Sequence, residues 1–156
     1  MRRDQTIREV ILSGGDPLSL STQRLGRLID RLDDIPSLTR LRFHTRLPIV
    51  LPSRIDSELV ERIKKGRLTP VFVVHTNHPR EISNEVSEAI DRLKDTGATL
   101  LNQTVLLRGV NDDADTLEVL SERLHAIGVL PYYLHLLDRA KGTSHFEVSE
   151  SDAQLI

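Results

Sequence analysis

The 156-residue chain has the composition of one globular domain, with 38% hydrophobic and 28% charged residues. Its net charge of −2, with both signs interspersed, excludes the basic surface that nucleic-acid binding requires. It contains no cysteine, no apolar run long enough to span a bilayer and no hydrophobic signal core after Met1. We therefore expect a single domain over residues 1–156 that is cytoplasmic and binds neither nucleic acid nor membrane.

The first predicted element is a short strand that ends in two glycines, an acid and a proline. Val10 and Ile11 suit a buried strand, and the following Gly14 and Gly15 let the backbone turn and let a ligand approach main-chain N–H groups. Asp16 adds a negative charge suited to an ammonium group. Alone, this pattern is also that of an ordinary turn between a strand and a helix.

Strands and helices then alternate along the first half of the chain. A helical pattern follows Leu18, with Ser21 or Thr22 as its cap, and residues 39–45 alternate as a strand does. Residues 46–54 are predicted to be irregular and bounded by prolines. Asp56 caps a second helix that stops near Gly66, and the apolar run at 71–75 indicates a buried parallel strand.

The second half repeats the same alternation. A helix is expected from Ser83 or Asn84 to Gly97, a strand over 99–106 and a helix over 114–127. A fifth strand is expected over 129–135, followed by a polar loop, and a last helix begins at Ser149 and stops mid-pattern at Ile156. The chain therefore looks incomplete at both ends.

The spacing of the strand ends predicts the fold. The positions Ser13, His44, His75, Gln103 and His135 follow one another at intervals of 31, 31, 28 and 32 residues, the length of one right-handed βα crossover unit. Five units indicate an α/β fold with an all-parallel sheet, either a doubly wound sheet or a partial (β/α) barrel. We favour the barrel, because polar residues recur at every strand's carboxyl end rather than at one switch point.

Histidines at three strand ends allow a metal site as one hypothesis. His44, His75 and His135, together with Asp138, supply imidazole and carboxylate ligands that suit zinc, iron or manganese. Composition alone would then suggest a metal-dependent barrel hydrolase in which the metal activates water. The alternative is that each histidine merely hydrogen-bonds a neighbouring loop, since no paired H-x-H spacing is present.

Two further polar residues stand out by position. Gln103 lies inside an apolar strand, where an unpartnered amide costs about 1 to 3 kcal/mol, so it points at a ligand or at a polar group of another strand. Asn102 faces the opposite way, as a structural hydrogen-bonder. Asp138 is a candidate receiver for a cationic substrate group, or else a solvated loop acid paired with Arg139 or Lys141.

Five stretches cover nearly the whole chain in unbroken order: VILSGGDPL (10–18), RLPIVLPSRI (46–55), HTNHPREI (75–82), NQTVLLRGVND (102–112) and PYYLHLLD (131–138). Together, and at matching intervals, they resemble the lysine 2,3-aminomutases, which are radical S-adenosylmethionine enzymes. The His-Leu-Leu-Asp ending of the last stretch resembles the branch that makes β-lysine for modification of elongation factor P.

The resemblance implies an isomerase that converts L-α-lysine to β-lysine. A [4Fe–4S] cluster cleaves S-adenosylmethionine, and the resulting radical takes a hydrogen from lysine held on pyridoxal phosphate. Ser13, Gly14 and Gly15 match the segment that receives the methionine end of S-adenosylmethionine, and His75 and Gln103 match two further contacts. The same likeness gives Val105 and Leu106 contact with adenine, places His135 near pyridoxal phosphate and gives Asp138 the substrate's ε-ammonium group.

Two features of the family are missing from the sequence. There is no CxxxCxxC motif before Glu9, and the lysine that anchors pyridoxal phosphate has no counterpart before Ile156. The chain therefore reads as a central fragment that is inactive alone, with no catalytic residue of its own. An open βα unit also exposes strand edges, so a homo-oligomer is expected. A cofactorless binding domain derived from the same family is a further alternative.

Overall fold

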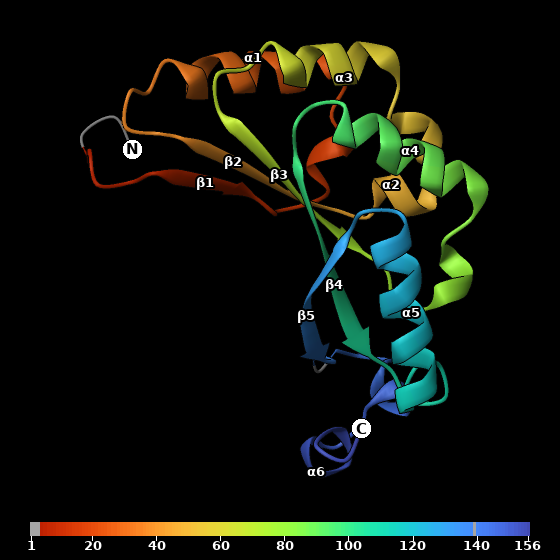
Figure 1. The fold of residues 1–156 in the computed structure, drawn as a ribbon. Coiled ribbons are helices and arrows are strands. Elements are labelled where there is room, and N and C mark those ends of the chain that lie inside the picture. The colour runs from red at the N-terminus through yellow and green to blue at the C-terminus, as the bar shows by residue number, and fades with distance from the viewer. Residues whose placement is uncertain (1–3, 139) are drawn as a thin grey trace.

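A computed structural model describes residues 4–138 and 140–156 as five parallel strands in a single sheet (Figure 1). The sheet order is the chain order, β1-β2-β3-β4-β5, and every neighbouring pair is parallel. Sequential order means that no switch point exists, which separates this sheet from a doubly wound one. The prediction of a partial (β/α) barrel is confirmed. The strands are β1 (Glu9–Leu12), β2 (Arg40–Thr45), β3 (Thr69–His75), β4 (Thr99–Leu106) and β5 (Leu130–Leu136).

The longer helices begin at side-chain caps. Ser21, Asp56, Ser83 and Asp113 each accept a hydrogen bond from a backbone N–H in the first turn of the helix that follows. Residues 46–54, predicted to be irregular, instead form a short helix and a 3₁₀ turn. The helices are α1 (Thr22–Asp33), α2 (Leu47–Val50), α3 (Ser57–Lys64), α4 (Asn84–Lys94), α5 (Ala114–Ala126) and α6 (Glu150–Ala153).

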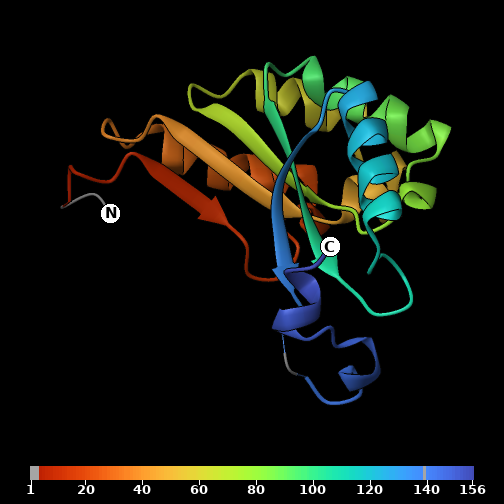
Figure 2. The same ribbon diagram turned by 60° about the horizontal axis from the view of Figure 1, so that its bottom comes forward.

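The core lies between the sheet and the longer helices, which cover one face of the sheet (Figures 1 and 2). Alternate strand residues point into this layer, and Phe43 of β2 stacks on Phe72 of β3 with ring centroids 4.7 Å apart. Both rings are fully buried. The sequential βα units place their helices on the same side because right-handed crossovers all turn the same way.

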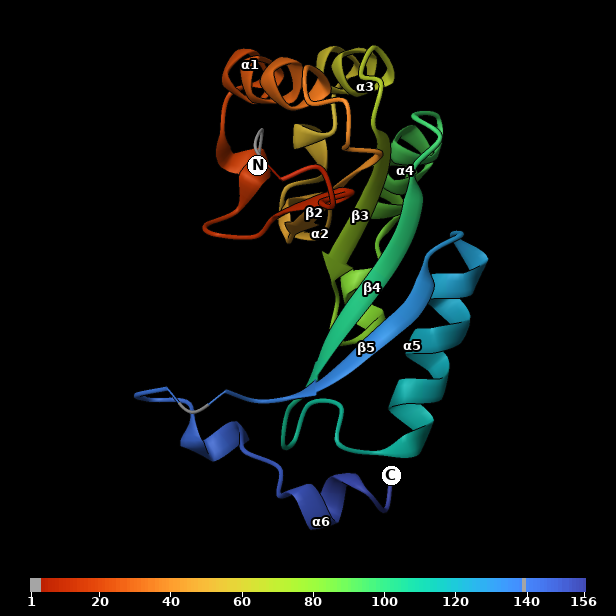
Figure 3. The same ribbon diagram turned by 90° about the vertical axis from the view of Figure 1, so that its left-hand side faces the viewer.

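The opposite face of the sheet carries no helix and is concave (Figures 2 and 3). The guanidinium carbon of Arg42 on β2 lies 5.9 Å from the ring centre of Tyr132 on β5, although two strands separate them. Such a contact requires strong curvature of the sheet. A register shift opposite Asn102 and Gln103 accompanies the bend.

The edge strand β5 is exposed along its whole length, in contrast to β3. All seven of its residues are exposed, including the large side chains of Tyr132, Leu134 and Leu136. Beyond it the chain runs through a loop to α6, which lies away from the main body (Figure 3). No helix in the described part of the chain is both long and apolar enough to cross a bilayer.

Candidate functional site

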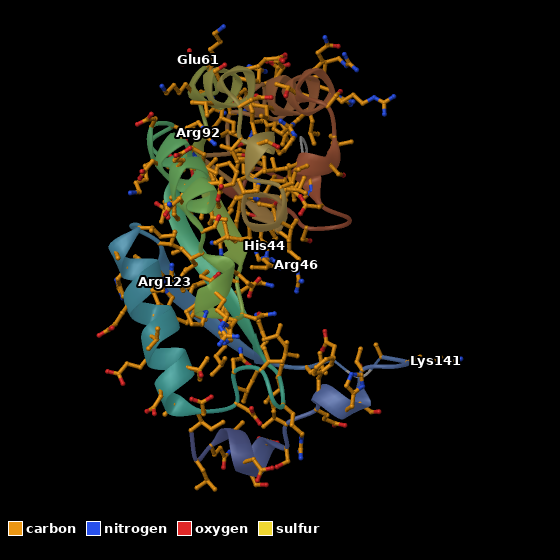
Figure 4. The ribbon with its side chains drawn as sticks, turned by 90° about the vertical axis from the view of Figure 1, so that its right-hand side faces the viewer. His44, Arg46, Glu61, Arg92, Arg123 and Lys141 are labelled. Atoms are coloured by element: carbon orange, nitrogen blue, oxygen red, sulfur yellow. The ribbon has the colours of Figure 1, made fainter. Side chains whose placement is uncertain are left out.

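The candidate site lies where the parallel strands end. Ser13 follows β1 directly, His44 and His75 lie at or next to the ends of β2 and β3, and Gln103 lies in the last half of β4. Because carboxyl ends of parallel strands share one edge of a sheet, these side chains share one rim. Figure 4 shows His44 and Arg46 close together at this rim.

The turn after β1 leaves its backbone open. Ser13, Gly14 and Gly15 are exposed, Gly15 has a φ of +58°, and a Cβ built on either glycine would meet no atom within 4 Å. Space of that kind admits a ligand against main-chain groups, and a side chain at Gly15 would be strained.

The Asp16 carboxylate is hydrogen-bonded within the protein and is not a free charge. Its carboxylate accepts hydrogen bonds from the Leu18 amide (3.0 Å), the Thr45 hydroxyl (2.7 Å) and the Arg46 amide (2.7 Å). The expectation that Asp16 is suited to an ammonium group is therefore not supported. These hydrogen bonds explain its position, because they connect the turn after β1 to the end of β2.

His75 and Gln103 form the centre of the site. They are register partners on β3 and β4, and the Gln103 Nε2 lies 3.4 Å from the His75 Nδ1. This is the polar partner on another strand that the sequence predicted for Gln103. When Nδ1 accepts this hydrogen bond, the ring proton is on Nε2, and that Nε2 is buried with no hydrogen-bond partner among the described residues.

Burial keeps the imidazoles of the rim uncharged at neutral pH. Desolvation, followed by the positive charge of Arg46, lowers the pKa of His75 to about 4. The pKa of His44 is also lowered, chiefly by burial, although its contact with Gln103 opposes the shift. The imidazoles of His44 and His75 therefore offer neutral hydrogen-bonding groups, beside the positive charge of Arg46.

Asn102 fixes the backbone on the other side of this pair. Its side chain accepts from the Thr76 amide (2.9 Å) and donates to the Thr76 carbonyl (3.0 Å) and the Thr104 hydroxyl (2.8 Å). Since Thr76 follows His75 and Asn102 precedes Gln103, these bonds keep His75 and Gln103 side by side on the two neighbouring strands. The prediction that Asn102 is a structural hydrogen-bonder facing the helices is confirmed.

Asn111 is a second structural residue, and its role was not foreseen. It is fully buried, accepts from the Leu107 amide and donates to the carbonyls of Asn77 and Val105. The Val105 amide in turn donates to the Asn77 side chain at 2.9 Å. The only sequence signal is an asparagine within a turn-forming Gly-Val-Asn-Asp stretch.

This network and the burial pattern limit what the end of β4 offers to a ligand. Both backbone groups of Val105 are already bonded, so only its side chain is free for contact. Leu106 is fully buried on the face that carries the helices, so its side chain does not face the open side of the sheet, and its contact with adenine stays a prediction.

The last candidates lie at the exposed edge. His135 is exposed on β5 and influences the pKa of both His44 and His75, which places it near the rim. Asp138 is exposed and lines a cavity of about 170 Å³ together with Leu137 and residues of the following loop. Arg139, the suggested ion-pair partner of Asp138, lies outside the described residues.

The metal-site hypothesis fails on geometry. Within residues 4–138 and 140–156, no three side chains of His, Asp or Glu are grouped so that they could hold a metal ion. The hydrolase alternative built on His44, His75, His135 and Asp138 is therefore not supported.

Curated relatives match almost the entire chain. An L-lysine 2,3-aminomutase from Haemophilus influenzae is 51% identical over 150 residues, which cover 96% of this chain and 44% of that protein. A glutamate 2,3-aminomutase from Clostridioides difficile is 38% identical over 97% of this chain and 36% of its own length. The chain thus spans less than half the length of the curated relatives it matches. No family model matches.

A solved structure agrees with the fold. A radical SAM methyltransferase from Sphaerobacter thermophilus superposes with a TM-score of 0.65, covering 96% of this chain and 46% of that one at 18% identity. At that identity the likeness concerns the fold alone, and it supports a partial α/β barrel. The sequence matches show more than the fold. The chain is a homologue of the lysine 2,3-aminomutases over nearly all of its own length, which corresponds to less than half of theirs.

Proposed function

We propose that this chain forms the S-adenosylmethionine-binding part of a radical aminomutase that converts L-α-lysine to β-lysine. The observation that carries the proposal is the hydrogen-bonded pair of His75 and Gln103 on the open face of a barrel, in a sequence 51% identical to an L-lysine 2,3-aminomutase. The metal-dependent hydrolase has no comparable support.

The residues at the rim fit S-adenosylmethionine in two respects. The open backbone at Ser13, Gly14 and Gly15 suits the amino and carboxylate groups of a methionine moiety. The His75 Nε2 is buried without a partner among the described residues, and when His75 Nδ1 accepts from Gln103 this Nε2 carries a proton that a ligand acceptor would satisfy. In the complete enzyme these residues would bind and orient S-adenosylmethionine, which would supply the radical chemistry.

The other two cofactors are not served by this chain in the same way. The 156 residues contain no cysteine, so the ligands of a [4Fe–4S] cluster would have to come from elsewhere. His135 is exposed at the edge strand, and we propose only that it lies near pyridoxal phosphate. We expect the 156 residues alone to be inactive.

Asp138 is the proposed contact for the substrate. An exposed carboxylate beside a small cavity at the end of β5 has the charge to bind an ε-ammonium group, and closure of the site would strengthen that pair by removing water. A relative named glutamate 2,3-aminomutase indicates that overall sequence similarity does not by itself fix the substrate. An acid at this position favours lysine.

The proposal includes a cytoplasmic homo-oligomer that makes β-lysine for elongation factor P. The exposed edge of β5 supports self-association, and the His135-to-Asp138 stretch supports the branch. Mass spectrometry of elongation factor P from cells with and without the gene encoding this chain tests the product's destination: we expect the β-lysyl adduct to be lost with the gene.

Calorimetric titration of the 156-residue chain with S-adenosylmethionine tests the core of the proposal. We expect saturable binding, weakened roughly tenfold by His75→Ala because a buried hydrogen-bond donor is lost. His125→Ala, on the exposed surface of α5, is the matched control and should leave the affinity unchanged. Absence of binding to the folded chain would favour the cofactorless binding domain instead.

A further inference from the structure

Arg54 lies in the stretch of residues 46–55, which has no role in the proposed function so far. It is the last residue of the 3₁₀ turn Pro52–Arg54, between β2 and α3. Its partly buried guanidinium contacts a segment some 35 residues earlier in the chain, residues 18–22, which leads into α1. This segment follows the glycine turn, defined as Ser13, Gly14 and Gly15.

Three nitrogen atoms of the guanidinium donate to that segment. Nε donates to the Leu18 carbonyl at 2.8 Å, and Nη2 donates to the Leu20 carbonyl at 3.0 Å. Nη1 donates to the Thr22 hydroxyl at 3.2 Å. Because the donors of a guanidinium are fixed relative to one another in one plane, bonds to three alternate residues fix the path of the chain from 18 to 22.

The same segment is joined to the glycine turn at Asp16. The Leu18 amide donates to the Asp16 carboxylate, and the Ser19 amide donates to the Asp16 carbonyl at 3.0 Å. Gly15 has a φ of +58°, and neither glycine of the turn makes a hydrogen bond within the described part of the chain. The conformation of the glycine turn therefore depends on how its two ends are held: by β1 before it, and by Asp16 and the segment bonded to Arg54 after it.

The target of these bonds distinguishes Arg54 from other arginines that donate to carbonyls. Arg92 on α4 donates to the Ile55 carbonyl, and Arg123 on α5 donates to the Pro79 carbonyl (Figure 4). Those bonds hold the connections after β2 and β3, neither of which contains a glycine. The bonds of Arg54 hold the connection that the proposed function places against the ligand.

We propose that Arg54 is a positioning residue that keeps the glycine turn in the open conformation that receives the methionine end of S-adenosylmethionine. The inference rests on the proposed function for the identity of that ligand. The three bonds of Arg54 are present without it, so the ligand and the positioning role are tested by separate measurements.

The decisive variant is Arg54→Met, which keeps an unbranched side chain and removes every donor. Arg54→Lys keeps the charge but replaces the planar fork by a single ammonium group, so we expect an intermediate effect. Arg67→Met is the matched control. Arg67 donates to the carbonyls of Asp33, Ile35 and Leu38, which precede β2 and therefore lie at the end of the sheet opposite the rim.

The first measurement is NMR relaxation of the Gly14 and Gly15 amides in the ligand-free, isotope-labelled chain. We expect an order parameter of about 0.85 in the wild type, the value of rigid backbone, and one below about 0.6 in Arg54→Met. Arg67→Met should keep the wild-type value, and Arg54→Lys should fall between the two. A wild-type turn that is already mobile, unchanged order in a folded Arg54→Met chain, or an equal loss of order in Arg67→Met each overturns the proposal.

The second measurement is the S-adenosylmethionine titration of the same variants. We expect the dissociation constant to rise roughly tenfold in Arg54→Met, because a mobile turn must be ordered again on binding, and to stay within about twofold in Arg67→Met. A merely structural role would lower the free energy of unfolding in both variants without this difference in affinity.

The two measurements together separate the positioning role from the ligand. A mobile turn in Arg54→Met, without any binding by the wild type, retains the positioning role and rejects the ligand. Equal affinity in Arg54→Met and the wild type overturns the proposal, and so does weaker binding with unchanged order of the glycine turn. If Arg54→Met does not fold, Arg54→Lys is measured by the same criteria.

Discussion

The two faces of the sheet differ in how deeply their side chains are buried. On the helix-covered face Leu41, Phe43 and Val74 are at most 3% exposed, and the buried Asn102 is fully hydrogen-bonded. On the concave face Ile11 is 52% exposed, and the curvature buries only the middle of the sheet.

Polar groups divide in the same way. Asn102 and Asn111 satisfy backbone groups behind the strands, whereas the concave face holds the Nε2 atoms of His44 and His75. Among the described residues these two atoms have no partner, and the only other such buried side-chain atom is the hydroxyl of Thr76. A surface that stabilises a fold completes its hydrogen bonds internally, and one that binds a ligand leaves some open. The comparison assigns stability to one face and recognition to the other, and four predictions probe it.

The largest effect is expected from the covered face. Phe72→Ala removes a fully buried ring that stacks on Phe43, and we expect the free energy of unfolding to fall by about 3 to 5 kcal/mol. Ile11→Ala, a truncation of an apolar residue that is half exposed on the concave face, should cost less than about 1 kcal/mol. Urea unfolding of both variants gives the comparison. Equal losses would mean that the concave face is covered in solution.

The buried polar network ranks next. Asn102→Leu leaves the Thr76 amide without an acceptor, and we expect a loss of about 2 kcal/mol in unfolding free energy. The exposed Asn84→Leu is the control for the same exchange at the surface. The NMR signals of His75 and Gln103 should shift in the first variant only. Stability equal to that of the wild type would show that Thr76 finds another acceptor.

Much of the covered face was predictable from sequence, because its rules are local. The caps Ser21, Asp56 and Ser83 and the crossover spacing depend only on neighbouring residues. The short helix α2 was missed, since prolines at 48 and 52 indicate irregular backbone, although Pro48 lies in the first turn of α2 and Pro52 begins the 3₁₀ turn.

The site was predictable only in part. The polar residues at the strand ends follow from spacing. The cost of an unpartnered amide inside an apolar strand predicts that Gln103 points at a ligand or at a polar group of another strand, and the structure shows His75 on β3 as such a group. The hydrogen bonds of Asp16 could not be predicted in this way, because its three donors come from two separate stretches of chain. The same holds for Asn111, which gathers carbonyls from Asn77 and Val105. Such contacts depend on how the elements pack and leave no periodic trace in the sequence.

Acidification should weaken the fold through the concave face. The pKa of His75 is about 4, below its ordinary value of 6.5, because of burial and of the nearby Arg46 and His44; His135 adds to the effect and Asp16 opposes it. The unfolded chain then binds the proton more tightly, so stability is lost as pH falls from about 6.5 towards 4.

Urea unfolding at pH 7 and pH 5 measures that loss. We expect a decrease on the order of 1 kcal/mol attributable to His75, after allowance for solvent around a half-buried ring. His75→Gln should flatten the pH dependence over this interval, while His125→Gln should not. A wild-type slope retained in His75→Gln would assign the acid sensitivity to other groups.

The smallest effect concerns the contact that spans the concave face. The Arg42 guanidinium, held by Glu9 at 2.7 Å, lies 5.9 Å from the Tyr132 ring centre and links β2 to the edge strand. Tyr132→Leu should cost about 0.5 kcal/mol, the value of an exposed cation–π contact. Because global unfolding barely resolves such a change, hydrogen exchange of β5 amides is the sharper measurement, with Tyr133→Leu as a neighbour of similar exposure. Faster exchange in Tyr132→Leu alone would show that this contact holds the edge strand in its curved position. Equal exchange in both variants would mean that the curvature is set by the strand pairing of β4 and β5 itself.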